Sequence, residues 1–205
     1  MKRPALITLK TLVWLACLWP LVRLLWGAAT NNLGADPTAT ITFATGVATL
    51  RILTVSLAIT PLRRLSPRIG WLIKFRRLLG LFAFFYASLH LLTYVALYAG
   101  FDVNTIAADI TKRRYITVGV AAWVLLLPLA ATSTNWAIRK LGGKRWNRLH
   151  KLVYAAALCG VIHYWWQVKP GVRTPLTITI VLAVLLLARP VLSWVQQRKT
   201  RACTA

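Results

Sequence analysis

The sequence is short of acidic residues. It has three aspartates, Asp36, Asp102 and Asp109, and no glutamate, against 26 lysines and arginines, while 58% of its 205 residues are hydrophobic. This mix excludes an ordinary soluble domain and is typical of a small membrane protein. A net charge of +23 would by itself suggest nucleic-acid binding. Because the basic residues stand in short clusters between long apolar runs, we expect membrane lipid, and no nucleic acid, as a partner.

Two kinds of cofactor motif are also missing. The three cysteines, Cys17, Cys159 and Cys203, form no CxxC or CxxCH pattern, which excludes a zinc knuckle and covalently attached c-type haem. No strand is followed by GxGxxG, so an NAD(P)H or flavin reductase domain would have to belong to another chain. We find no linker, low-complexity tract or internal repeat and therefore expect a single domain over residues 1–205.

Long apolar runs are what the sequence does contain. Six of them approach the roughly 20 residues that cross about 30 Å of hydrocarbon as a helix. They are 12–29, 41–62, 78–99, 115–132, 149–167 and 175–194. The first could be a cleaved signal peptide, because Lys2 and Arg3 precede it. Pro20 and Arg23 within this run, and the lack of a small-residue cleavage site, favour a retained helix. The prediction is an all-α membrane protein, a six-transmembrane-helix bundle.

Basic residues are divided unevenly between the two ends of these runs. The N-terminal stretch, the connections 63–77 and 139–151 and the tail 198–201 carry 18 of them. The opposite ends, at 112–114 and 169–173, carry five. The positive-inside rule then predicts that both termini are cytoplasmic.

Two of the three histidines, His90 and His163, fall deep inside apolar runs. An imidazole in hydrocarbon needs a hydrogen-bond partner, a cavity or a metal, because an unsatisfied polar group costs several kcal/mol there. His90 lies about 18 Å along one outward-going helix and His163 about 21 Å along another, so the two rings reach similar heights. They could each bond a neighbouring helix, or together supply both axial ligands of a b-type haem iron. Zinc is disfavoured because no carboxylate or thiolate pair lies at that depth.

The third histidine, His150, lies about 20 Å below His163 on what we expect to be the same helix, and it could hold a second haem. Where the third run would supply a matching inner histidine, the sequence has Arg76 and Arg77. These arginines could pair with haem propionates or a quinone, or could serve only as positive-inside anchors. Arg51, halfway along the second run, is a costly intramembrane charge that a propionate, a quinone oxygen or a backbone carbonyl could satisfy.

Seven stretches carry a family resemblance. They are LGADP (33–37), ITPL (59–62), RRLLGL (76–81), LHLLTY (89–94), TST (132–134), KLGGKRWNRLHKLVY (140–154) and IHYWWQVK (162–169). With these stretches in this order, the chain resembles the ferric-reductase-like transmembrane superfamily. It most closely resembles the haem-binding membrane subunits of periplasmic methionine-sulfoxide reductase systems.

The resemblance implies a specific role in the bacterial inner membrane. A subunit of this kind is non-catalytic and carries electrons through haem b, from the quinone pool or a cytosolic flavin reductase, to a periplasmic molybdopterin-containing reductase that repairs oxidised methionine. It implies His90, His150 and His163 as axial ligands of haem iron, with Arg76 in place of an inner ligand. FMN is also associated with the family.

Two alternatives remain open from the sequence. One is a haem-free six-helix transporter or channel whose histidines relay protons, although the inverted repeats common in transporters are not evident. The other keeps the haem in a stand-alone transmembrane ferric reductase.

Overall fold

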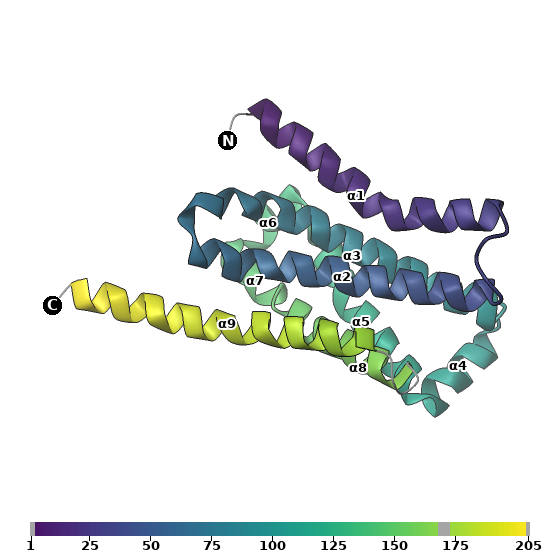
Figure 1. Cartoon of the computed structure of the whole chain (residues 1–205). Helices are drawn as coiled ribbons and strands as arrows, with labels where there is room; N and C mark the ends of the chain where they lie inside the picture. The colour runs from purple at the N-terminus through teal and green to yellow at the C-terminus, as the bar shows by residue number, and fades with distance from the viewer. Residues whose placement is uncertain (1–2, 168–172, 204–205) are drawn as a thin grey trace.

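The computed structural model describes residues 3–167 and 173–203, and these residues form a bundle of helices (Figure 1). The elements in chain order are α1 (Arg3–Ala29), α2 (Pro37–Leu65), the short 3₁₀ segment η1 (Pro67–Leu72), α3 (Ile73–Thr93), the π-helical turn η2 (Tyr94–Tyr98), α4 (Val103–Lys112), α5 (Arg114–Ala131), α6 (Asn135–Leu141), α7 (Gly143–Leu149), α8 (Leu152–Gln167) and α9 (Arg173–Cys203). The all-α prediction is confirmed for this part of the chain. Lys2 and Lys169, which enter the charge asymmetry, lie outside the described residues.

Five helical segments within the described residues are long and apolar enough to cross a membrane. They are Pro4–Ala29, Pro37–Leu65, Arg68–Tyr98, Arg114–Ala131 and Pro175–Leu192. The remaining predicted run contains α8, whose 16 residues would extend about 24 Å, less than the hydrocarbon thickness of about 30 Å. α8 nevertheless packs inside the bundle, mainly against α5 and also against α2 and α9.

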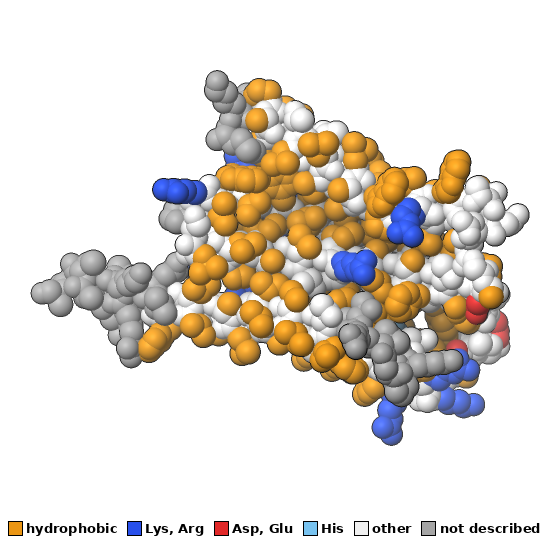
Figure 2. Space-filling view, in the orientation of Figure 1, with side chains coloured by type: hydrophobic (Ala, Val, Ile, Leu, Met, Phe, Trp, Pro, Cys, Tyr) orange, Lys and Arg blue, Asp and Glu red, His pale blue; other side chains and the backbone are white. Residues whose placement is uncertain are grey.

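Apolar side chains cover much of the outer surface of the bundle. Trp26 is 73% exposed, Leu187 68% and Leu25 61%, and Figure 2 shows hydrophobic side chains spread over the middle of the visible face. A water-soluble monomer rarely exposes so large an apolar surface, whereas lipid tails cover it without cost. The core lies between α2, α3, α8 and α9, where Leu57, Ala83 and Ala157 are almost fully buried.

Helix α1 is bent at Pro20 and is fastened there by one side chain. Proline has no N–H and its ring displaces the preceding turn of the helix. The fully buried Tyr86 of α3 enters the opened turn: its hydroxyl donates to the carbonyl of Cys17 (2.7 Å) and accepts from the N–H of Leu21 (3.1 Å). The phenol therefore stands in for the hydrogen bond that these two backbone groups would make to each other in a regular helix.

Two further prolines shape α2. Asp36 caps its first turn by accepting from the N–H of Ala39 (2.9 Å), and Pro37 occupies the first helical position, as the sequence predicts. Near the other end, Pro61 cannot donate to the carbonyl of Leu57. The guanidinium of Arg189 in α9 donates to that carbonyl instead (2.6 Å), which ties α9 to α2.

The expectation that one helix carries both His150 and His163 is wrong. α7 ends at Leu149, His150 and Lys151 form a turn, and α8 begins at Leu152. The imidazole Nδ1 of His150 lies 3.0 Å from the carbonyl oxygen of Trp146, and the two rings stack with centroids 3.7 Å apart. A side chain that bonds and stacks on the preceding turn favours a helix end over continuation.

Candidate functional site

His90 and His163 face each other across the bundle. His90 comes from the last turns of α3 and His163 from α8, and their ring centroids are 5.8 Å apart with ring planes inclined at 80°. Two imidazoles bound to one metal ion through metal–nitrogen bonds of about 2 Å have centroids about 6 Å apart. The pair therefore has the separation that one shared metal centre requires, at the common depth expected from the sequence.

Hydrogen bonds determine which nitrogen of each imidazole ring is available to bind a metal. Nδ1 of His90 lies 2.9 Å from the carbonyl oxygen of Thr42, and Nδ1 of His163 lies 2.7 Å from that of Tyr115. A carbonyl only accepts, so each Nδ1 carries the proton and each Nε2 keeps its lone pair. Metal-binding histidines are oriented in this way, with one nitrogen bonded to a carbonyl and the other directed to the metal.

The donor set suits haem iron better than a bare ion. Within residues 3–167 and 173–203, no group of three or more His, Cys, Asp or Glu side chains comes together. A zinc ion at this pair would lack two of its four ligands. The iron of a porphyrin receives four ligands from the macrocycle and needs only two axial imidazoles from the protein. The residues present therefore fit a haem held by His90 and His163.

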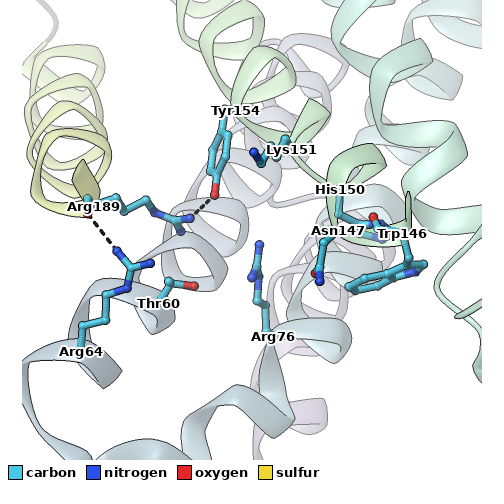
Figure 3. Close-up of a pocket in the computed structure, with 9 residues that line it drawn as sticks. All are labelled: Thr60, Arg64, Arg76, Trp146, Asn147, His150, Lys151, Tyr154 and Arg189. Carbon is cyan, nitrogen blue, oxygen red and sulfur yellow. Dashed lines mark hydrogen bonds between the residues drawn. The ribbon is translucent and has the colours of Figure 1, made fainter. Parts of the chain in front are cut away.

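A second site lies at the end of the bundle where α2 ends and α3 begins, in a cavity of about 250 Å³ (Figure 3). We call it the inner cavity, and it is lined by Thr60 and Arg64 of α2, Arg76 of α3, Trp146 and Asn147 of α7, His150 and Lys151 of the turn, Tyr154 of α8 and Arg189 of α9. Four of the lining side chains are cations and none is a carboxylate. The field inside the cavity therefore favours an anionic ligand.

His150 is the histidine of this cavity. Its Nδ1 is engaged with the Trp146 carbonyl, while its buried Nε2 has no hydrogen-bond partner in the described part of the chain. The hydroxyl of Thr60 is likewise buried without a partner there. In Figure 3, the Arg76 side chain extends into the same space, between Thr60 and His150. With Nδ1 protonated, Nε2 keeps a lone pair that a metal or a hydrogen-bond donor would satisfy, while the cations of the lining suit a ligand that carries acidic groups.

The other two arginines singled out from the sequence do not line the inner cavity. Arg77 is exposed and donates to Asn135 Oδ1 (2.7 Å). Arg51 lies on the exposed side of α2 and does not line the inner cavity. Of the three arginines for which a propionate or quinone contact is predicted, Arg76 lines this cavity.

Sequence reasoning overlooked three residues of the inner cavity, Arg64, Tyr154 and Arg189. Arg189 hydrogen-bonds the Tyr154 hydroxyl and the Leu57 carbonyl, and its own carbonyl accepts from Arg64 Nη1 (2.9 Å). The signal was present, since Arg189 stands inside the last apolar run, where a charge is as costly as at Arg51 and calls for an explanation.

Comparison with known proteins identifies the family of the chain. The family described as "Ferric reductase like transmembrane component" matches residues 38–161. A protein of Herminiimonas arsenicoxydans named "Protein-methionine-sulfoxide reductase heme-binding subunit MsrQ" is 48% identical over 201 residues, which are 97% of this chain and 92% of that protein. Proteins of the same name from Ralstonia nicotianae and Polaromonas naphthalenivorans are 48% and 51% identical, over 84% and 77% of this chain and 79% and 72% of their own lengths.

These matches cover most of the chain. Together with the helical bundle and its apolar surface, they describe a multi-pass membrane protein. The chain belongs to the ferric-reductase-like transmembrane family and, within it, to the MsrQ group.

Proposed function

We propose that the chain is the haem-binding, electron-transferring membrane subunit of a protein-methionine-sulfoxide reductase. The observation that carries this proposal is the facing pair His90 and His163, with both Nδ1 atoms bonded to carbonyls and ring centroids 5.8 Å apart. A haem b bound there would alternate between Fe(III) and Fe(II), and so accept and pass on single electrons. The chain's own part is to orient two neutral imidazoles in a low-dielectric surround, which sets the redox potential.

The inner cavity is assigned a second haem, with His150 as its imidazole ligand. The two propionate groups of this haem would pair with the cations that line the cavity, among them Arg76 and Arg189. Support comes from the unpartnered Nε2 of His150 and from a lining with four cations and no carboxylate. Arginine is a poor ligand for iron, so Arg76 has the role of a propionate partner. Electrons would enter at this end, from the quinone pool or from a cytosolic flavin reductase, with FMN as a further carrier.

The orientation follows from the distribution of basic residues. Six membrane crossings, with α8 as the short fifth one, put both termini and the inner cavity on the cytoplasmic side of the inner membrane. His90 and His163 then lie nearer the periplasm, where the partner would be a molybdopterin-containing reductase that repairs oxidised methionine. The relatives' printed names support the reductase partnership.

Haem content of ligand variants tests the proposal. We expect the full chain, purified in detergent, to show a reduced b-type absorption spectrum. His90→Ala and His163→Ala should each remove the haem bound by the pair. Matched controls are Leu92→Ala and Leu158→Ala, which truncate exposed side chains on the same two helices, 51% and 56% exposed.

Each outcome decides between functions. Loss of haem in the two histidine variants, with wild-type content in the leucine controls, supports the assignment. Unchanged haem in both histidine variants would refute it. A colourless wild-type protein that moves solutes in liposomes would favour a transporter instead.

A further inference from the structure

The two facing imidazoles rest on the same local arrangement, repeated in two helix pairs. His90 of α3 bonds the carbonyl of Thr42 in α2, and Gly46 follows Thr42 by four residues. His163 of α8 bonds the carbonyl of Tyr115 in α5, and Gly119 follows Tyr115 by four residues. In both pairs the glycine also lies against the imidazole ring.

Helix geometry explains why the spacing is four. In an α-helix the carbonyl of residue i accepts from the N–H of residue i+4, and side chains lean toward the N-terminus. A Cβ at i+4 therefore lies over the turn that contains the carbonyl of residue i. A ring from a neighbouring helix can reach the second lone pair of that carbonyl only where this Cβ is missing.

The distances show how closely the rings approach. A Cβ added at Gly119 would lie 2.7 Å from Nδ1 and 2.9 Å from Cε1 of His163. A Cβ added at Gly46 would lie 3.1 Å from Cε1 and 3.2 Å from Nδ1 of His90. Non-bonded heavy atoms prefer about 3.5–4.0 Å, so either added methyl group displaces the ring, and the displacement is larger at position 119.

We propose that Gly46 and Gly119 are positioning residues for the two axial histidines. They hold each Nδ1–H on its carbonyl and so fix the direction and basicity of the opposite nitrogen. This inference rests on the proposed function, because it concerns the haem held by His90 and His163. Partners that orient a metal-binding histidine commonly change metal affinity about 10- to 100-fold when they are altered.

Three alanine variants of the full chain test the proposal. Gly119→Ala and Gly46→Ala add the methyl group against a ring. Gly80→Ala is the matched control, because Gly80 lies inside α3 and a Cβ there has no other atom within 4 Å. All three replacements raise helix propensity by the same amount, so differences between them report on the space around each glycine.

The readouts are haem affinity on reconstitution, the optical signature of two axial imidazoles and the midpoint potential. We expect Gly119→Ala to bind haem about 10- to 100-fold more weakly and to lose that signature. Gly46→Ala should keep its haem with a smaller loss of affinity and a more positive midpoint potential, because a weakened Nδ1–H bond makes the imidazole a poorer donor to Fe(III). Gly80→Ala should match the wild type.

Wild-type affinity, spectrum and potential in both Gly46→Ala and Gly119→Ala would overturn the inference. If Gly119→Ala fails to fold, as judged by circular dichroism and gel filtration, the midpoint potential of Gly46→Ala tests the inference instead. Haem retained in His90→Ala and His163→Ala would instead refute the proposed function. Haem lost in those variants, with glycine variants that behave like Gly80→Ala, would refute only the positioning role.

Discussion

The facing pair and the inner cavity are built on opposite principles. His90 and His163 present two neutral rings to each other, each fixed by one carbonyl and one glycine of the next helix. The inner cavity has a single histidine, four cations and buried polar atoms without partners in the described residues. The first arrangement fixes a ligand geometry in advance, whereas the second supplies charge for a ligand that brings its own acidic groups. The proposed placement in the membrane would account for the difference, because uncompensated charge is far more costly near the middle of the bilayer than near its surface.

Removing the inner imidazole should separate the two sites most clearly. We expect His150→Ala to lower haem from two per chain to one, because the inner cavity then offers no nitrogen to iron. The remaining spectrum should be that of the facing pair. Pyridine haemochrome assay of the purified chain measures the ratio, with Leu158→Ala, an exposed residue outside the cavity lining, as the control. A ratio unchanged by His150→Ala would contradict the inner assignment.

A second prediction concerns stability and again sets the inner cavity apart. Arg189→Leu removes the donor to the Leu57 carbonyl, which Pro61 cannot replace, and the bond to the Tyr154 hydroxyl. Two charge-assisted hydrogen bonds are lost, so the free energy of unfolding should fall by roughly 3 kcal/mol. Denaturant titration in detergent micelles, followed by circular dichroism, measures this. Arg189→Lys, which keeps a charge and a donor, should recover part of the loss, and the spectrum of the facing pair should not change in either variant.

Tyr86→Phe should destabilise the chain less and should alter neither site. It removes two neutral hydrogen bonds in the bend of α1, worth roughly 2 kcal/mol together. The same denaturant titration measures the loss. Since Tyr86 lies one helical turn before His90, this variant shows whether destabilisation alone changes the haem spectrum. A spectral change in Tyr86→Phe would mean that the geometry of the pair depends on how α1 is attached.

The smallest effect is expected on the outer side, at the start of α4. Hydrogen bonds from the Thr105 hydroxyl, and from the N–H groups of Asn104 and Thr105, lower the pKa of Asp102 below its ordinary value of 3.8. Because the pKa of Asp102 is lower in the folded chain, the cap stabilises α4 fully at pH values above the pKa of the unfolded chain. This contribution is lost as the pH falls through the pKa of the folded chain. The protection of α4 amides from hydrogen exchange, measured relative to the intrinsic exchange rate at each pH, should therefore decrease on acidification in the wild type.

Asp102→Asn provides the control for this acid response, because its side chain does not titrate there. The protection of α4 amides relative to the intrinsic exchange rate should then show no extra decrease at low pH. A wild-type response identical to that of Asp102→Asn would show that the cap contributes nothing measurable.

Much of the fold was accessible from the sequence because lipid imposes simple rules. Helix length, the apolar runs and the rise per residue were enough to place His90 and His163 at one depth. The capping role of Asp36 followed from the residues beside it and is confirmed. These features depend on one helix at a time, which a sequence specifies directly.

Features that depend on contacts between helices were not accessible in the same way. The glycines beside the rings have meaning only once α2 is known to pack on α3, and α5 on α8. The turn at His150, where the imidazole stacks on Trp146, interrupts a run of residues that reads as continuous helix. Arg189 could have been noticed, but its acceptor is a carbonyl left free by a proline 128 positions earlier in the chain, at Pro61.

The bend of α1 bears on how the chain is assembled during synthesis. Tyr86 follows Leu21 by 65 residues, so α1 leaves the ribosome and enters the bilayer well before the phenol that fastens it exists. The two hydrogen bonds that fasten the bend of α1 can therefore form only after α3 has been synthesised.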